Sequence, residues 1–218
     1  MTWKVPDNFF FDRLNQLKRF NTLQEKNALL VEDTEPVSSI LKELTDLTPI
    51  NELEAQAFLL KLREISVGDE IELIVTCPHC NTMNNPFFPI EKCFNKIPLK
   101  FKGKKIPYGL FTTPETIINT DNLSLKDYSK LEKLLKEQNN NLLKLRHGFM
   151  CRKCNQKIFI DIDPRKVFSK STLTKIYDDY VKISMFTHNG KQDIDLLYPF
   201  ERELYQTLIE AELAPKGE

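Results

Sequence analysis

The sequence predicts an α+β fold, in which helical N- and C-terminal parts enclose a small antiparallel sheet. Apolar residues recur every three to four positions near both ends of the chain, as in amphipathic helices, and alternate in the middle, as in strands. Two Cys-x-x-Cys pairs, at 77–80 and 151–154, each join two strand-like segments. We therefore expect three regions: a helical part at 1–68, a β region at 69–163 with a long insertion at 91–146 between the pairs, and a helical part at 164–218.

The N-terminal part is predicted to contain three helices. Thr22 and Glu25 have the spacing of a capping box just before an apolar run at 28–31. Pro36 suits the first turn of a second helix, which carries apolar residues at helical spacing up to Leu47. A third helix is expected from Asn51 to Ile65, and its wide apolar arc indicates that it is buried.

The middle of the chain is predicted to be mainly β-structure. After Gly68, alternating residues predict a strand over 70–77 that runs into Cys77, and a returning strand over 82–90. Prolines punctuate the insertion, where short strands are expected at Leu99–Phe101 and Ile106–Leu110.

A polar helix is predicted over Asn122–His147, interrupted by the sequence EQNNN at 137–141. The strand after the second cysteine pair places Ile158, Ile160 and Ile162 on one face, and Pro164 ends it. Two C-terminal helices are expected at about 171–186 and 192–213, separated by HNG at 188–190.

The clearest chemical signal is a set of four cysteines, Cys77, Cys80, Cys151 and Cys154. Two turns that each present two thiolates supply the four sulfurs of a closed, tetrahedral, zinc-ribbon-like site, so the sequence predicts one structural zinc ion. The two pairs are separated by 70 residues, whereas zinc ribbons often have fewer than about 25. Such an insertion is compatible with one site if its two ends meet.

Other interpretations of the cysteines and histidines stay open. The four cysteines also fit small apolar core groups, or a redox-active Cys-x-x-Cys, although both pairs join strands rather than a strand and a helix. His79 is an alternative metal ligand, and Cys93 is expected to be a buried free thiol. His147 and His188 are expected to be surface or helix-capping residues.

Charge and composition exclude several function classes. The chain has 31 Lys and Arg against 31 Asp and Glu, so it lacks the overall basic excess of a nucleic-acid-binding protein. No apolar run approaches the roughly 20 residues that cross a bilayer, and no signal peptide is visible, so we expect a cytoplasmic protein without a membrane span. Known catalytic sequence motifs are missing, so we expect a protein that is not an enzyme and has no small-molecule substrate.

Two stretches carry a family resemblance. They are LLKLREISVGDEIELIVTCPHC at 59–80 and DIDLLYPFERELYQTLIEAEL at 193–213. Together they resemble the zinc-ribbon-containing baseplate hub and hub assembly proteins of T-even-type (T4-like) contractile-tailed phages. The resemblance implies a non-enzymatic protein that binds other baseplate or tail proteins, in the host cytoplasm during assembly and in the tail baseplate of the virion. It implies no catalytic residues.

The last predicted helix is the candidate partner-binding element, with residues Phe200, Arg202, Leu204, Tyr205 and Leu208. Core packing explains its apolar stripe equally well. The alternative function is a zinc-ribbon nucleic-acid-binding or transcription-associated factor, because basic residues surround the second cysteine pair: Arg152, Lys153 and Lys157.

Overall fold

A computed structural model describes residues 2–214 and has the predicted α+β architecture. The α-helices are α1 (Phe9–Leu14), α2 (Thr22–Leu29), α3 (Val37–Leu44), α4 (Glu52–Ser66), α5 (Leu125–Leu142), α6 (Pro164–Val167), α7 (Leu173–Thr187), α8 (Lys191–Leu196) and α9 (Pro199–Leu213). The strands are β1 (Glu70–Glu72), β2 (Val75–Thr76), β3 (Met83–Asn84), β4 (Phe87–Pro89), β5 (Lys100–Phe101), β6 (Lys104–Lys105), β7 (Arg146–Met150) and β8 (Lys157–Asp161). Two short 3₁₀ helices, η1 (Ile90–Cys93) and η2 (Pro114–Thr116), lie in the insertion.

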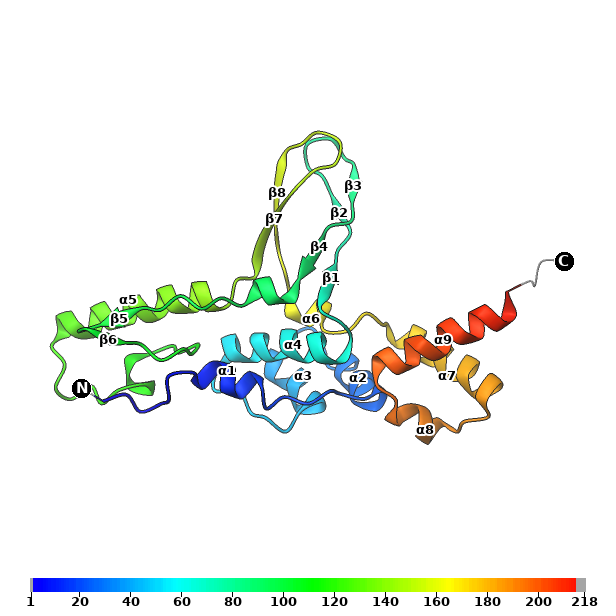
Figure 1. The fold of residues 1–218 in the computed structure, drawn as a ribbon, viewed down its shortest axis with the longest axis horizontal. Coiled ribbons are helices and arrows are strands. Elements are labelled where there is room, and N and C mark those ends of the chain that lie inside the picture. Colours follow the sequence, from blue (N-terminus) through cyan, green and yellow to red (C-terminus); the bar gives the residue numbers. More distant parts are fainter. Residues whose placement is uncertain (1, 215–218) are drawn as a thin grey trace.

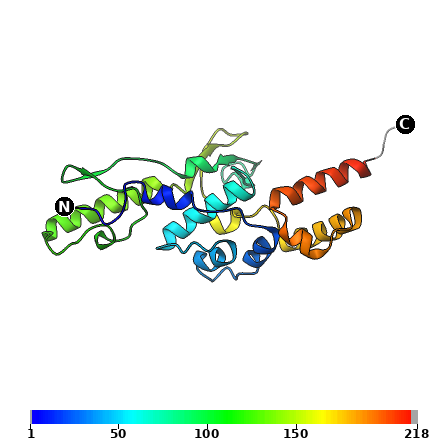
Figure 2. The ribbon, with the colours of Figure 1, turned by 60° about the horizontal axis from the view of Figure 1, so that its bottom comes forward.

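The molecule is elongated, and its elements form four parts (Figure 1). Helices α1–α4 and α6 make a central body. The arm, built from α5, β5 and β6, extends from one end of that body, and α7–α9 lie at the other end, as a second view confirms (Figure 2). The ribbon, which contains β1–β4, β7 and β8, stands away from the body. Among the described residues, no helix combines the length and apolar character that crossing a membrane requires.

Helix α4 is the centre of the body, as its apolar sequence predicts. The side chain of Asn51 caps the helix by accepting a hydrogen bond from the N–H of Glu54, at 2.9 Å. Phe58 and the leucines that follow it are fully buried among residues of α3, β1 and α6. Burying each such side chain contributes about 1.5–3 kcal/mol. The prediction of a buried helix over Asn51–Ile65 is thus confirmed to within one residue at each end.

The ribbon consists of two antiparallel hairpins. Strand β1 pairs with β4, and β2 pairs with β3. The single strand predicted over 70–77 is therefore wrong in detail, because the pairing is interrupted at residues 73–74, where only the N–H of Leu73 bonds the carbonyl of Pro86. Strands β7 and β8 pair over five residues each. Of the three isoleucines predicted to share one face, Ile158 and Ile162 are buried and Ile160 is partly buried.

The two ends of the insertion meet beside the ribbon, which is the condition for joining both cysteine pairs in one site. Phe94 forms an antiparallel bridge with Leu143. The N–H of Lys144 donates to the carbonyl of Cys93 at 2.8 Å. The long spacer thus leaves the ribbon and returns to it at the same place.

The arm has a small core of its own, and two predictions within it are wrong. Helix α5 runs without a break through EQNNN, because Gln138 and Asn139 donate to the carbonyls of Pro107 and Phe111, at 2.7 and 2.9 Å. The strand expected at Ile106–Leu110 is instead β6, which comes just before it. The arm core contains these buried residues: Phe101, Ile106, Phe111, Ile117, Ile118, Leu131 and Leu135.

The C-terminal part contains three helices rather than the predicted two. Helix α7 matches its predicted bounds closely. His188 caps the C-terminus of this helix in the left-handed conformation, with φ of 59°, and helix capping was one of the two roles predicted for it. The helix expected over 192–213 is divided into α8 and α9, because Pro199 cannot continue a helix and instead occupies the first turn of α9.

A buried ion network joins this C-terminal part to the body. The guanidinium of Arg202 on α9 donates to Glu25 on α2 at 2.9 Å and to Asp179 on α7 at 3.0 Å. Arg202 and Glu25 are at most 1 % exposed. The guanidinium of Arg202 also donates to the hydroxyl groups of Thr22 and Ser171, at 3.0 and 2.9 Å.

This network corrects two sequence interpretations. Thr22 and Glu25 do not form the predicted capping box, because Asn21 and Gln24 form it one residue earlier. The polar pattern at 22 and 25 reflects the buried ion network instead. Arg202 is not available to a partner protein, since its charged group is enclosed.

Candidate metal centre

The four predicted cysteines come together at the far end of the ribbon. Their sulfur atoms all lie within 4.8 Å of one another. The Sγ atoms of Cys77 and Cys154 are 3.7 Å apart, and those of Cys80 and Cys151 are 3.6 Å apart. A tetrahedral ion with metal–sulfur bonds of about 2.3 Å, typical of zinc, requires sulfur–sulfur separations of roughly 3.8 Å. Since a disulfide bond is about 2.05 Å long, the observed spacing fits a metal site and not a pair of disulfides.

Each cysteine pair lies on a turn of the same shape. In the first, the N–H of Cys77 bonds the carbonyl of Thr82 at 2.9 Å; in the second, the N–H of Cys151 bonds that of Gln156 at 2.9 Å. The residue after each pair is an asparagine in the left-handed conformation, Asn81 with φ of 56° and its counterpart at 155 with φ of 54°. Asparagine tolerates this conformation better than most residues. The repeated sequence Cys-x-x-Cys-Asn was thus a further signal for two equivalent turns, and our sequence analysis missed it.

Hydrogen bonds to the sulfur atoms favour thiolates in part of the cluster. The N–H groups of Cys154 and Lys153 lower the pKa of Cys151 to about 6. At Cys154, the N–H of Gln156 favours the thiolate, but burial and the neighbouring thiols raise the pKa to about 12. Thiolates this close repel one another, and a divalent cation at their centre would remove that repulsion, so binding is expected to release the remaining protons.

Asn84 supports the cluster from outside, and sequence reasoning did not identify it. Its amide donates to the sulfur of Cys151 at 3.7 Å and to the carbonyl of Thr82 at 2.8 Å, while its oxygen accepts from the N–H of Arg152 at 3.0 Å. The side chain is buried, although it lies near the end of a projecting ribbon. It therefore links the two turns and fixes the orientation of one sulfur.

The remaining candidate ligands lie outside the cluster. Among the described residues, the metal-binding group contains only the four cysteines, and His79 is exposed. Cys93 is buried, as predicted, and burial raises its pKa to about 11. His147 is not the predicted surface residue, because its ring is buried 3.6 Å from Cys93 Sγ and packs against Phe88.

The predicted partner-binding residues on α9 are distributed over two faces. Leu204 and Leu208 are 57 % and 58 % exposed. Phe200 is 39 % exposed, with the guanidinium of Arg19 5.0 Å from its ring centre. Tyr205 packs against the core of α7–α9. The leucines thus lie on the surface, unlike Arg202.

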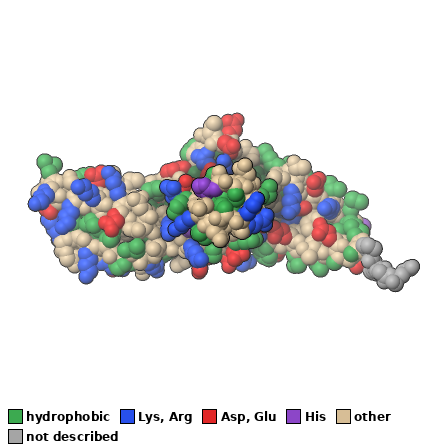
Figure 3. All heavy atoms as spheres, turned by 90° about the horizontal axis from the view of Figure 1, so that it is seen from above, with side chains coloured by type: hydrophobic (Ala, Val, Ile, Leu, Met, Phe, Trp, Pro, Cys, Tyr) green, Lys and Arg blue, Asp and Glu red, His purple; other side chains and the backbone are tan. Residues whose placement is uncertain are grey.

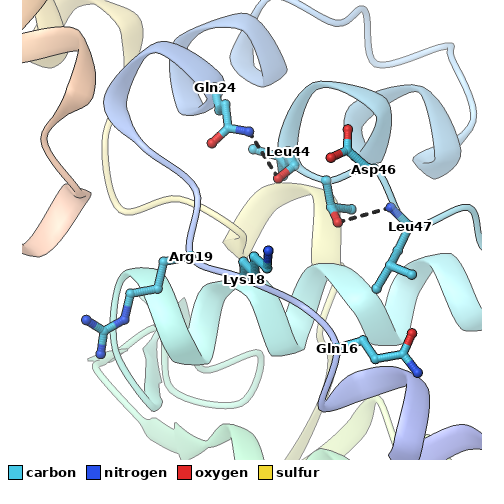
Figure 4. Close-up of a pocket in the computed structure, with 8 residues that line it drawn as sticks. Gln16, Lys18, Arg19, Gln24, Leu44, Asp46 and Leu47 are labelled. Atoms are coloured by element: carbon cyan, nitrogen blue, oxygen red, sulfur yellow. Dashed lines mark hydrogen bonds between the residues drawn. The ribbon is translucent and has the colours of Figure 1, made fainter.

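A hollow of about 370 Å³ lies between α2, the end of α3 and residues 16–19 (Figure 4). Across it, the amide of Gln24 reaches the carbonyl of Leu44 at 3.5 Å. Its charged lining residues are Lys18, Arg19 and Asp46. The lining contains no cysteine or histidine, and sequence reasoning did not single it out.

Comparisons with known proteins identify the family. No curated protein and no solved structure matches the chain. The sequence model of a family described as T4 bacteriophage base plate protein matches residues 13–141. This range includes the stretch at 59–80 that carries the family resemblance, and with it the first cysteine pair. It ends before the second cysteine pair at 151–154 and before the second such stretch at 193–213. Since the match covers more than half of the chain, this protein belongs to the T4 bacteriophage base plate protein family.

Proposed function

We propose that this protein is a non-enzymatic structural or assembly component of a contractile-tail baseplate, held together locally by one zinc ion. The observation that carries the proposal is a closed set of four cysteine sulfurs at the end of a ribbon that projects from a baseplate-family chain (Figure 1). Four thiolates fill a tetrahedral coordination shell and leave no position for a reactive water. Sites of this kind stabilise a fold rather than catalyse a reaction.

The partners we propose are other baseplate or tail proteins, which the chain meets in the host cytoplasm during assembly. Cytoplasmic thiols are kept reduced, which suits a thiolate–metal site. The outward face of α9 offers Leu204 and Leu208, each more than half exposed. Exposed leucines spaced along one helix are typical of a surface that a partner helix covers.

Replacing Leu204 and Leu208 together with serine is expected to weaken tail-protein binding at least tenfold. Each leucine loses about 1.5–3 kcal/mol of burial at an interface, whereas an exposed position costs the free protein little stability. The measurement is co-purification of tail proteins from infected cells, with partners identified by mass spectrometry and affinities then measured with the purified partner.

The matched control is Leu125→Ser at the start of α5, where the leucine is 89 % exposed. It should leave partner binding unchanged. Equal losses in both variants, or undiminished binding in the double variant, would contradict a role for the α9 surface. A chain that never co-purifies with tail proteins would contradict the proposed function itself.

One observation favours the alternative of nucleic-acid binding. Phe159 on the second hairpin is 54 % exposed, and the cationic groups of Arg146 and Lys157 lie 5.3 and 5.0 Å from its ring centre. Seen from above, basic side chains flank the protruding ribbon (Figure 3). An aromatic ring among cations resembles the platforms on which single-stranded bases stack.

Salt dependence distinguishes this alternative from the proposed function. A nucleic-acid-binding ribbon would hold single-stranded DNA or RNA with an affinity that falls steeply as salt rises, and Lys157→Gln would reduce that slope by roughly one unit. We expect no such binding above the level shown by Lys133→Gln, a control on α5. A steep slope that only Lys157→Gln reduces would favour the alternative.

A further inference from the structure

We propose that a cavity between the central body and the C-terminal helices binds an oxyanion of the phosphate class. The cavity has a volume of about 410 Å³, within the range of about 300–1,000 Å³ that small-molecule sites occupy. It is lined by residues of α4, the β1 region, the α6–α7 segment, α7 and α9, including Arg63, Glu72, Lys166, Lys170, Lys175 and Glu203.

The main observation is a buried guanidinium whose hydrogen bonds are incomplete. Arg63 is 3 % exposed, and its Nη2 donates to the carbonyl of Glu70, bracing the turn between α4 and β1. Its Nε and Nη1 atoms have no hydrogen-bond partner among the described residues. Leaving two N–H donor atoms of a buried charged group without acceptors is costly, and more so than for a neutral group. Two of the three guanidinium nitrogens therefore have donor capacity that an oxyanion in the cavity can use.

The walls of the cavity add positive charge around this arginine. Lys166, Lys170 and Lys175 line it, so its four cations face two carboxylates, those of Glu72 and Glu203. The three lysines are exposed and come from different positions along the α6–α7 segment, which allows their flexible side chains to converge on a ligand. The excess of cations favours a dianion such as phosphate over a single carboxylate.

The nearest internal alternative is an ion pair between Arg63 and Glu203. Burial lowers the pKa of Arg63, and the charge of Glu203 opposes that effect, so the two groups sense each other. Among the described residues, however, Glu203 makes no hydrogen bond to the guanidinium and no ion pair with it within 4.0 Å. A bound oxyanion would supply the missing acceptors, and Glu203 would oppose its binding by charge repulsion.

The test is titration of the purified, full-length protein with inorganic phosphate, by calorimetry above neutral pH at constant ionic strength. We expect saturable binding of one phosphate per chain. Replacing Lys166 and Lys170 together with glutamine should raise the dissociation constant by roughly tenfold or more, and Glu203→Gln should lower it severalfold. Arg63 itself is left unchanged, because Arg63→Met would also remove its hydrogen bond to the carbonyl of Glu70 and is expected to destabilise the fold.

The matched control replaces Lys126 and Lys133 on α5 with glutamine, which makes the same change in net charge on exposed residues away from the cavity. It should leave the dissociation constant unchanged. Non-saturable binding, or an equal loss in control and cavity variants, would show a general charge effect and overturn the proposal. Glu203→Gln that destabilises the protein without tightening phosphate binding would also overturn it, because the carboxylate would then be the partner of Arg63.

Discussion

Replacing Cys151 and Cys154 together with serine is expected to abolish metal binding and to unfold the ribbon while the rest of the chain keeps its helices. The cluster at the ribbon end contains few apolar groups besides the cysteines themselves: Ile158, with Val75, Phe149 and Ile160 packed against it. So small a core gives little stability. Structural zinc, by contrast, contributes an apparent binding free energy of about 10–16 kcal/mol in zinc-finger peptides. The measurements are elemental analysis, native mass and backbone amide NMR spectra.

The matched control is Cys93→Ser, which removes the cysteine that lies outside the cluster. This variant should keep one zinc ion per chain and a folded ribbon. Native protein without metal, or a double variant whose ribbon resonances are unchanged, would contradict a structural zinc site. The baseplate family assignment would be unaffected, because it rests on the sequence match.

Alkylation separates the zinc site from a redox-active cysteine pair. In native protein the four clustered thiols should resist iodoacetamide, and a chelator should make them reactive. Cys93 should stay unreactive until the protein unfolds, because it is buried and its pKa is raised to about 11. Rapid labelling of one cysteine pair without chelator would favour the redox interpretation.

The fold class and the four-cysteine cluster could be predicted because each rests on a local pattern. Helix α4 has a cap at Asn51 and an apolar arc, and each cysteine pair specifies its own turn. Bringing the pairs together required the insertion to return to its starting point, which depends on the bridge between Phe94 and Leu143. No local sequence pattern predicts that bridge.

The features that sequence reasoning missed depend on contacts between distant segments. Helix α5 continues through EQNNN because carbonyls of the preceding segment accept hydrogen bonds from Gln138 and Asn139. A polar run on an exposed helix is compatible with a break in the helix. Only the hydrogen bonds to a distant segment determine that the helix continues. The same holds for Arg202, which the sequence suggested as a partner-binding residue. Its actual partners, Glu25 and Asp179, lie 177 and 23 residues away in the sequence.

Replacing Arg202 with alanine is expected to destabilise the protein by about 3–5 kcal/mol, because both Glu25 and Asp179 then keep a buried charge without a partner. Chemical denaturation measures this loss. The control is Lys136→Ala, which breaks an exposed ion pair with Glu132 and should cost less than about 1 kcal/mol. A triple variant with Arg202→Met, Glu25→Gln and Asp179→Asn should recover most of the loss, since no buried charge is left.

The pH dependence of the Arg202→Ala variant gives the sharper test. Burial raises the pKa of Asp179 above its usual value, and the charge of Arg202 lowers it. Without the arginine, this pKa rises further, so the folded protein binds a proton at pH values where the unfolded chain has released it. Stability of the variant should then fall as pH rises through that interval, and its deficit relative to wild type should narrow in acid. A deficit that does not change with pH, together with a triple variant no more stable than Arg202→Ala, would mean that the volume of the arginine, and not its charge, holds α9 against the body.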